Sequence, residues 1–191
     1  EFVATGSEIY HGNLPEGGWE KLESADAIIF GSPTYMGSVS WQFKKFADAS
    51  SKPWFTQQWK DKVFAGFTNS ATMNGDKLST LHYLFTLAMQ HSGIWVGTGM
   101  MPSNAKAAQR NDVNYVGSFS GAMAQSPSDS SPAEMLPGDL ETAKLFGQRP
   151  HLVPHLAQLA HQGLGLVAAG RHRIRCGDPV ALAGQKPHER D

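Results

Sequence analysis

Two stretches of glycine and hydroxyl-bearing residues are the parts of this chain best suited to chemistry. The first is Gly31-Ser32-Pro33-Thr34-Tyr35-Met36-Gly37-Ser38, and the second is Thr68-Asn69-Ser70-Ala71-Thr72-Met73-Asn74-Gly75. Each follows a short apolar run. A turn at the carboxyl end of a buried parallel strand is where an open α/β sheet binds a ligand, because backbone amides there point away from the sheet. The pattern predicts a ligand-binding edge, although such turns also serve simply to reverse the chain.

Alternating strands and helices must position these turns. The apolar runs 25–30 and 62–68 are too short for helices and are predicted to be buried strands. Between them, a helical face is predicted behind Ser38 or Ser40, either of which is placed to cap it, with apolar positions at Val39, Phe43, Phe46 and Ala47.

A second helix is predicted after a capping Asp76, with Gly93 as its stop and a further strand at 94–97. Its apolar face is formed by Leu78, Leu81, Phe85, Ala88 and Met89. Strands separated by helices imply parallel pairing through right-handed crossovers. The predicted fold class is therefore α/β, a doubly wound parallel sheet in a three-layer α/β/α sandwich.

Composition limits the classes of partner. The chain has 191 residues, a net charge of -1 and 17% charged residues, so no electrostatic feature favours nucleic acid or an anionic membrane. No apolar run approaches the ~20 residues that span a bilayer. The single cysteine, Cys176, suits a reducing compartment, and we expect a cytoplasmic protein that binds small ligands.

The region after Gly99 departs from this regular pattern. About thirty residues rich in Ser, Asn, Met, Gly and Pro follow it, and they are interpreted either as a functional lid or rim or as a passive loop. Phe119, Met123 and Met135 are its candidate anchors, and a helical run begins at Asp139. From residue 150 onward, His, Arg, Gly and Pro dominate, so we expect a domain at 1–149 and an atypical, non-native tail at 150–191.

Other motifs carry less chemistry. Gly97-Thr98-Gly99 starts like a dinucleotide fingerprint but lacks its last glycine. A hydrolase is disfavoured because Phe119 stands where a nucleophile elbow needs serine. His151 and His155 lack a third metal ligand, so no metal site is predicted.

The segment 25–37 resembles the third-strand signature of the flavodoxin-like NAD(P)H:quinone oxidoreductases related to the tryptophan-repressor-binding protein, within the wider NADPH-dependent FMN reductases. The likeness continues through Trp54, 68–75, His91 and 117–121, and covers about residues 1–148. Family members begin with a strand and a phosphate-binding loop, whereas Glu1 falls near their second strand. An N-terminally truncated flavodoxin-like fold is therefore expected, and FMN binding without that loop is an open question.

The resemblance implies FMN as cofactor, NAD(P)H as co-substrate and a quinone-like acceptor. It implies FMN contacts from Pro33, Thr34, Tyr35, Met36, Gly37, Ser70, Ala71, Thr72 and Gly75. It also implies a catalytic role for His91, as a donor that stabilises anionic reduced flavin. Structural roles remain open alternatives: Tyr35 covering the core, and His91 complementing a helix dipole.

The leading hypothesis is an FMN-dependent NAD(P)H:quinone-type oxidoreductase that reduces its acceptor by two electrons. The resemblance also implies a homo-oligomer, a dimer or tetramer. The rival hypotheses are a flavodoxin-like electron carrier that needs a protein partner, and a non-catalytic flavodoxin-like scaffold or fragment.

Overall fold

The computed structural model describes residue 14 and residues 16–149. The predictions for Glu1 and its neighbours and for the tail at 150–191, with His151, His155 and Cys176, lie outside the described residues.

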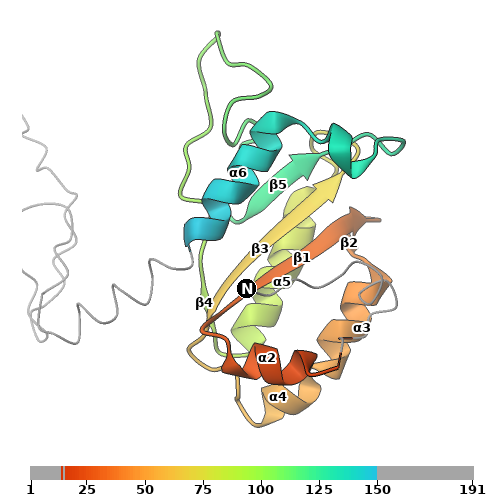
Figure 1. Cartoon of the computed structure of the whole chain (residues 1–191), viewed down its shortest axis with the longest axis vertical. Helices are drawn as coiled ribbons and strands as arrows, with labels where there is room; N and C mark the ends of the chain where they lie inside the picture. The colour runs from red at the N-terminus through yellow and green to blue at the C-terminus, as the bar shows by residue number, and fades with distance from the viewer. Residues whose placement is uncertain (1–13, 15, 150–191) are drawn as a thin grey trace, which may run out of the picture. The chain divides into compact units, whose positions relative to one another are not determined.

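One sheet organises the described residues (Figure 1). Its strands are β1 (Ala27–Tyr35), β2 (Ser38–Val39), β3 (Val63–Ser70), β4 (Ile94–Trp95) and β5 (Ala122–Gln125). β1 and β3 are parallel, and β4 and β5 pair in parallel with the beginning and the end of β3. β2 is antiparallel to β1. The prediction of a mainly parallel α/β sheet is confirmed.

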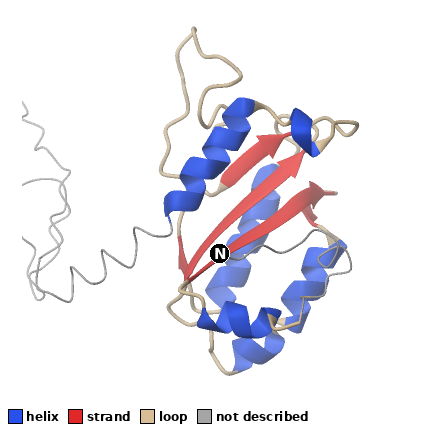
Figure 2. Ribbon diagram, viewed as in Figure 1, coloured by secondary structure: helices blue, strands red, loops and turns tan. Residues whose placement is uncertain are grey.

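Helices cover the two faces of this sheet (Figure 2). They are α2 (Gly18–Ser24), α3 (Trp41–Ala49), α4 (Ser51–Phe55), α5 (Lys77–Gln90) and α6 (Pro137–Gln148), with a short 3-10 helix η1 (Pro132–Glu134) before α6. Strand side chains alternate between faces. Phe64 packs in the core that includes Leu81 and Leu84 of α5, whereas Ala65 packs with Phe146 of α6. The three-layer arrangement follows from this alternation.

The core beneath α5 is rich in aromatic rings. Phe30 of β1 contacts Phe43 edge-on at 5.7 Å and lies 5.2 Å from Phe64, measured between ring centroids. Trp59 is 1% exposed and extends the cluster toward the start of β3. Because aromatic side chains bury large areas, this face supplies most of the apolar contact that fixes β1 against β3.

The predicted first turn is shorter than its sequence suggested. β1 continues through Pro33 to Tyr35, and Met36 and Gly37, with φ of 49° and 74°, form a two-residue hairpin to β2. Positive φ at both positions is typical of the type I′ hairpin turn. The interpretation of residues 31–38 as a loop was wrong. Among the described residues, most of β1 pairs with a strand on one side only, and a proline is tolerated in such a strand because its unpaired side needs no N–H donor.

The region after Gly99 also contains more structure than predicted. Its end forms β5, although Ala-Met-Ala-Gln lacks the β-branched residues that mark strands. Buried Asn114 organises the preceding segment, since its side-chain amide donates to the carbonyls of Met100 and Ser118. Phe119, a predicted anchor, is 57% exposed. Met123, also a predicted anchor, does pack against the core, so the segment is held by hydrogen bonds together with one of the expected apolar anchors.

Helix α3 begins after Ser40, one of the two predicted caps, but Val39, which was predicted to lie on its apolar face, belongs to β2, and α5 also differs in detail. Ser40 caps α3 by accepting a hydrogen bond from the Phe43 amide at 3.3 Å. Asp76 precedes α5 but makes no side-chain cap, because its φ of 54° is left-handed. The buried side of α5 contains Leu81, Leu84 and Ala88, while Leu78, Phe85 and Met89 are largely exposed.

This corrected face of α5 can be tested with two leucine truncations. Leu84→Ala should lower the free energy of unfolding by about 2–4 kcal/mol, because it leaves a cavity in a fully buried position. Leu78→Ala, on the same helix but 48% exposed, should cost less than about 1 kcal/mol. Urea denaturation measures both, and equal losses would contradict the described face.

Candidate functional site

The strand register brings the two hydroxyl-lined turns to one edge of the sheet. Ser32 of β1 lies opposite Thr68 of β3, and Pro33 lies opposite Asn69. Because β1 and β3 run parallel, the residues that follow, 34–37 and 70–75, meet at the carboxyl ends of both strands. The prediction that these turns adjoin is confirmed.

The first turn exposes some of its side chains and buries others. Thr34 is 8% exposed, and its Oγ1 lies 2.7 Å from that of Thr68 and 2.8 Å from that of Thr80. These three hydroxyls join β1, β3 and α5 beneath the edge. The Thr34 side chain is therefore structural, and its backbone is the part that remains for a ligand. Tyr35 is 62% exposed and Met36 is fully exposed, so neither covers the core.

The second turn presents an exposed surface with free donors. Ala71 and Thr72 are exposed, and Ser70 is half-buried. Within the described residues, the backbone N–H groups of Met73 and Asn74 donate no hydrogen bond. Gly75 has a φ of 55°, and a Cβ there would press on the hydroxyls of Ser70 and Thr72. The turn is compact, and glycine is required at its end.

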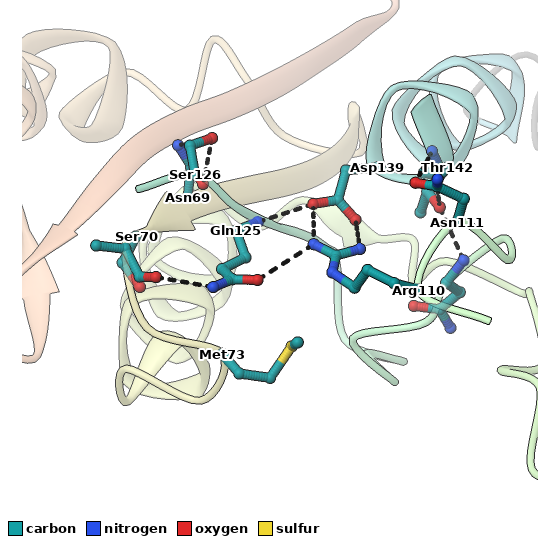
Figure 3. Close-up of polar contacts among 12 residues, drawn as sticks. Asn69, Ser70, Met73, Arg110, Asn111, Gln125, Ser126, Asp139 and Thr142 are labelled. Atoms are coloured by element: carbon teal, nitrogen blue, oxygen red, sulfur yellow. Dashed lines mark hydrogen bonds and ion pairs between the residues drawn. The ribbon is translucent and has the colours of Figure 1, made fainter. Parts of the chain in front are cut away.

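A polar network from β5 and α6 supports this second turn (Figure 3). The side-chain amide of Gln125 donates to the Ala71 carbonyl at 3.0 Å. The Gln125 backbone N–H donates at 2.9 Å to Asp139, which is 3% exposed. Arg110 in turn donates to both carboxylate oxygens of Asp139, at 2.8 and 2.7 Å. Arg110 also donates to Gln125 Oε1 at 3.4 Å, so the turn is tied through one side chain to the Arg110–Asp139 ion pair.

Arg110 is the charged centre of that network. Hydrogen bonding to Asp139 raises the pKa of its guanidinium, so the group stays fully charged. Its Cζ lies 5.6 Å from the Tyr115 ring centroid, in cation–π range. Sequence reasoning missed Arg110 and Gln125. Their signal was weak, because both lie in the segment interpreted as a lid or loop.

Lys77 was also missed. Its side chain is 1% exposed although it is the first residue of α5, and its Nζ donates to the carbonyls of Thr72 and Met73, the latter at 3.1 Å. Burial lowers the pKa of this amine. The sequence did contain an indication. A lysine in the first turn of a helix interacts unfavourably with the helix dipole, so a local interaction must compensate for it.

His91 lies apart from these residues. It ends α5, whereas the second turn precedes the start of that 14-residue helix, about 20 Å along the axis. The ring is 1% exposed, 4.3 Å from the Trp59 ring and 3.0 Å from Ser50 Oγ through Nε2. Burial lowers its pKa to about 4, so it carries no charge near neutral pH. The uncharged ring does not support the alternative of a charge that complements the helix dipole, and the predicted catalytic role of His91 as a hydrogen-bond donor stays a prediction.

A hollow lies near Trp59 and His91 rather than near the two turns. It has a volume of about 340 Å³ and is lined by residues of α2 and α4 and by their neighbours, namely Trp19, Glu20, Glu23, Ala49, Lys52, Pro53, Gln58 and Trp59. Trp59 precedes β3, so the hollow lies toward the amino ends of the strands. Open α/β sheets bind ligands at the carboxyl ends, and we therefore place the site at the two turns.

Among residues 14 and 16–149, no group of three or more His, Cys, Asp or Glu side chains is arranged to hold a metal ion. No helix in the same part of the chain is both long and apolar enough to cross a bilayer.

Comparison with known proteins adds an independent observation. The model of the NADPH-dependent FMN reductase family matches residues 10–107. Flavodoxin FldP of Pseudomonas aeruginosa is 54% identical over 150 residues, which cover 78% of this chain and 80% of that protein. An NAD(P)H dehydrogenase (quinone) of Archaeoglobus fulgidus is 37% identical over 130 residues, 68% of this chain. The match spans 60% of the length of that relative.

A solved structure supports the same likeness. The flavodoxin, WrbA-like protein from Agrobacterium tumefaciens has a TM-score of 0.59 and 54% sequence identity to this chain, with 76% of each chain covered. The resemblance drawn from residues 25–37 is thus confirmed, and so is the flavodoxin-like fold class.

The burial of His91 predicts a pH-dependent stability. Its pKa is about 4 in the fold and 6.5 when unfolded, so below pH 6.5 the unfolded chain takes up the proton first and stability falls. Between pH 7 and pH 5 this residue should cost about 2 kcal/mol of unfolding free energy. His91→Gln should remove that component from urea denaturation curves.

His82→Gln provides the matched control, because His82 lies on the same helix but is exposed. It should keep the wild-type pH dependence. The same loss for His91→Gln as for wild type would show that His91 is not buried in its neutral form.

Proposed function

The chain belongs to the NADPH-dependent FMN reductase family, and from this premise we propose that it moves two electrons from NAD(P)H to a quinone or similar acceptor through FMN bound at the two turns. The observation that carries the proposal is the register of β1 and β3, which sets residues 34–37 beside residues 70–75.

The donor set at this edge fits FMN. A flavin ring carries several oxygen and nitrogen acceptors on a flat aromatic frame, and it needs backbone donors together with an apolar flank. The unpaired amides of Met73 and Asn74 and the hydroxyl of Thr72 supply donors. Exposed Tyr35 and Met36 supply the aromatic and apolar flank.

FMN, when bound, supplies the hydride chemistry, and the protein is left with binding and orientation. Pro33, Tyr35 and Gly37 would line one side of the ring, with the Thr34 backbone between them. Ser70, Ala71, Thr72 and Gly75 would line the other side. Both walls are rigid, since one is held by the threonine cluster and the other by Gln125. Rigid walls orient two stacked rings without a protein nucleophile.

An electron carrier is the second candidate, favoured by the 54% identity to a protein named as a flavodoxin. Such a carrier exchanges electrons with a protein partner and does not turn over a nicotinamide substrate. Under either function we propose a cytoplasmic protein and a dimer or tetramer, in which a second copy completes the substrate side of the edge.

A steady-state assay separates the two functions. The full chain is loaded with FMN, and oxidation of NADH or NADPH is followed with benzoquinone as acceptor. Turnover with either nucleotide supports the oxidoreductase. A chain that binds FMN without such turnover supports the carrier, and a chain whose absorbance shows no bound FMN after loading contradicts both.

Replacement of Gly75 tests the proposed site directly. Gly75→Ala should weaken FMN binding at least about tenfold, because the added Cβ displaces the hydroxyls of Ser70 and Thr72. Gly17→Ala is the control: Gly17 has a φ of 72°, so the backbone strain of about 1 kcal/mol is similar, but a Cβ there meets nothing within 4 Å. Quenching of FMN fluorescence measures both affinities, and equal effects would contradict a site at the second turn.

A further inference from the structure

Lys77 combines deep burial with the lack of an acidic partner. In the part of the chain that the structure describes, its ammonium makes no ion pair, and its hydrogen-bond acceptors are the carbonyls of Thr72 and Met73. A buried lysine loses hydration, and its position at the start of α5 opposes the helix dipole. Something local must offset these costs.

The peptide geometry of the second turn shows what Lys77 does to its neighbours. In a trans peptide the carbonyl and the following N–H point in opposite directions. Because the carbonyls of Thr72 and Met73 point at Lys77, the N–H groups of Met73 and Asn74 point away from it. The backbone N–H groups of residues 71–75 donate no hydrogen bond within the described residues, and those of Met73 and Asn74 are the two whose direction the Lys77 contacts fix; both residues are exposed.

The charged groups near Lys77 include one ion pair, that of Arg110 with Asp139. Asp139 and Arg110 are the ionisable groups close enough to influence its pKa, in opposite senses. Arg110 already engages both oxygens of Asp139, so that pair is internally neutral. The ammonium of Lys77 is then the buried charge beneath residues 70–75 that has no ion-pair partner within the described residues, while the carboxylate of neighbouring Asp76 lies on the exposed side.

We propose that Lys77 is the positioning residue of the FMN site: it holds two carbonyls inward so that the amides of Met73 and Asn74 face the ligand, and its charge favours FMN in the reduced, negatively charged state. This inference rests on the proposed function. Lys77 would not contact the ligand. It would act by holding the second turn in place and through the electrostatic field of its ammonium.

Two variants separate the hydrogen bonds from the charge. Lys77→Met has a similar length but neither donor nor charge, whereas Lys77→Gln keeps an N–H donor without the charge. Lys60→Met is the control, because Lys60 is exposed and precedes β3 at the far end of the sheet. All are made in the full chain, and near-ultraviolet circular dichroism checks that each folds.

The first measurement is amide hydrogen exchange in the protein without FMN. Lys77→Met should speed exchange at the hydrogen-bonded amides that close the turn, those of residues 76, 77 and 79, at least about tenfold, because two carbonyls lose their donor and the turn opens. Lys77→Gln should retain most of the protection, and Lys60→Met should match wild type. Unchanged exchange in Lys77→Met would overturn the positioning role.

The second measurement is the ratio of FMN affinities in the oxidised and reduced states, obtained from the midpoint potential of the bound flavin. Both Lys77 variants should lower the preference for reduced FMN by about tenfold, since a nearby unit charge is removed. If Lys77→Met does not fold, Lys77→Gln alone decides this point. A ratio equal to wild type would overturn the electrostatic role.

The outcomes distinguish this inference from the proposed function. A wild-type chain that binds no FMN refutes the proposed function and the electrostatic role with it, while hydrogen exchange still decides the positioning role. A wild-type chain that binds FMN, together with variants that match it in both measurements, refutes the role of Lys77 alone.

Discussion

The parallel pairing of β1 and β3 is the constraint on which the rest of the structure depends. Seven residue pairs from Ala27↔Val63 to Pro33↔Asn69 fix where each strand ends. A shift of either strand by one residue would turn its own aromatic side chain, Phe30 or Phe64, out of the aromatic core and bring Ile29 or Ala65 in its place. The core on the α5 face therefore selects one register. The same register sets the two turns side by side, so packing at one end of the strands determines the geometry of the site at the other.

The site is rigid because the polar side chains beneath the two turns form hydrogen bonds with residues of the sheet and the helices. The Thr34, Thr68 and Thr80 hydroxyls bond to one another where two strands meet a helix, and Gln125 connects the second turn to the Arg110–Asp139 pair. Buried polar groups that lack partners are costly, so each such cluster specifies a single arrangement. Arg110 Nε is a buried exception without a partner among the described residues, and at the exposed edge the unpaired groups include the amides that we propose for the ligand.

The sequence predicted those elements that depend on interactions between residues close together in the chain. Short apolar runs indicated β1 and β3, and Ser40 indicated the start of α3, since a capping side chain acts within three residues. β5 was missed because pairing with β3, rather than its own composition, makes Ala122–Gln125 a strand. The buried face of α5 was shifted because the sequence does not show which side of a helix meets the sheet. The roles of Lys77 and His91 could not be predicted for the same reason, since both depend on burial by distant residues.

Two buried basic residues, Lys77 and His91, lie at opposite ends of α5 and therefore near opposite ends of the sheet. His91 gives up its charge, because its environment is Trp59 and a single hydroxyl, with no group to stabilise a cation. Lys77 has two carbonyls and a nearby carboxylate, and this is the environment that compensates an ammonium. Burial lowers the pKa of both groups, but backbone carbonyls accept from Lys77 whereas a single hydroxyl contacts His91. Of the two ends of α5, the end where the turns meet is therefore the one with acceptors for a buried cation, and this is the end at which we propose the flavin site.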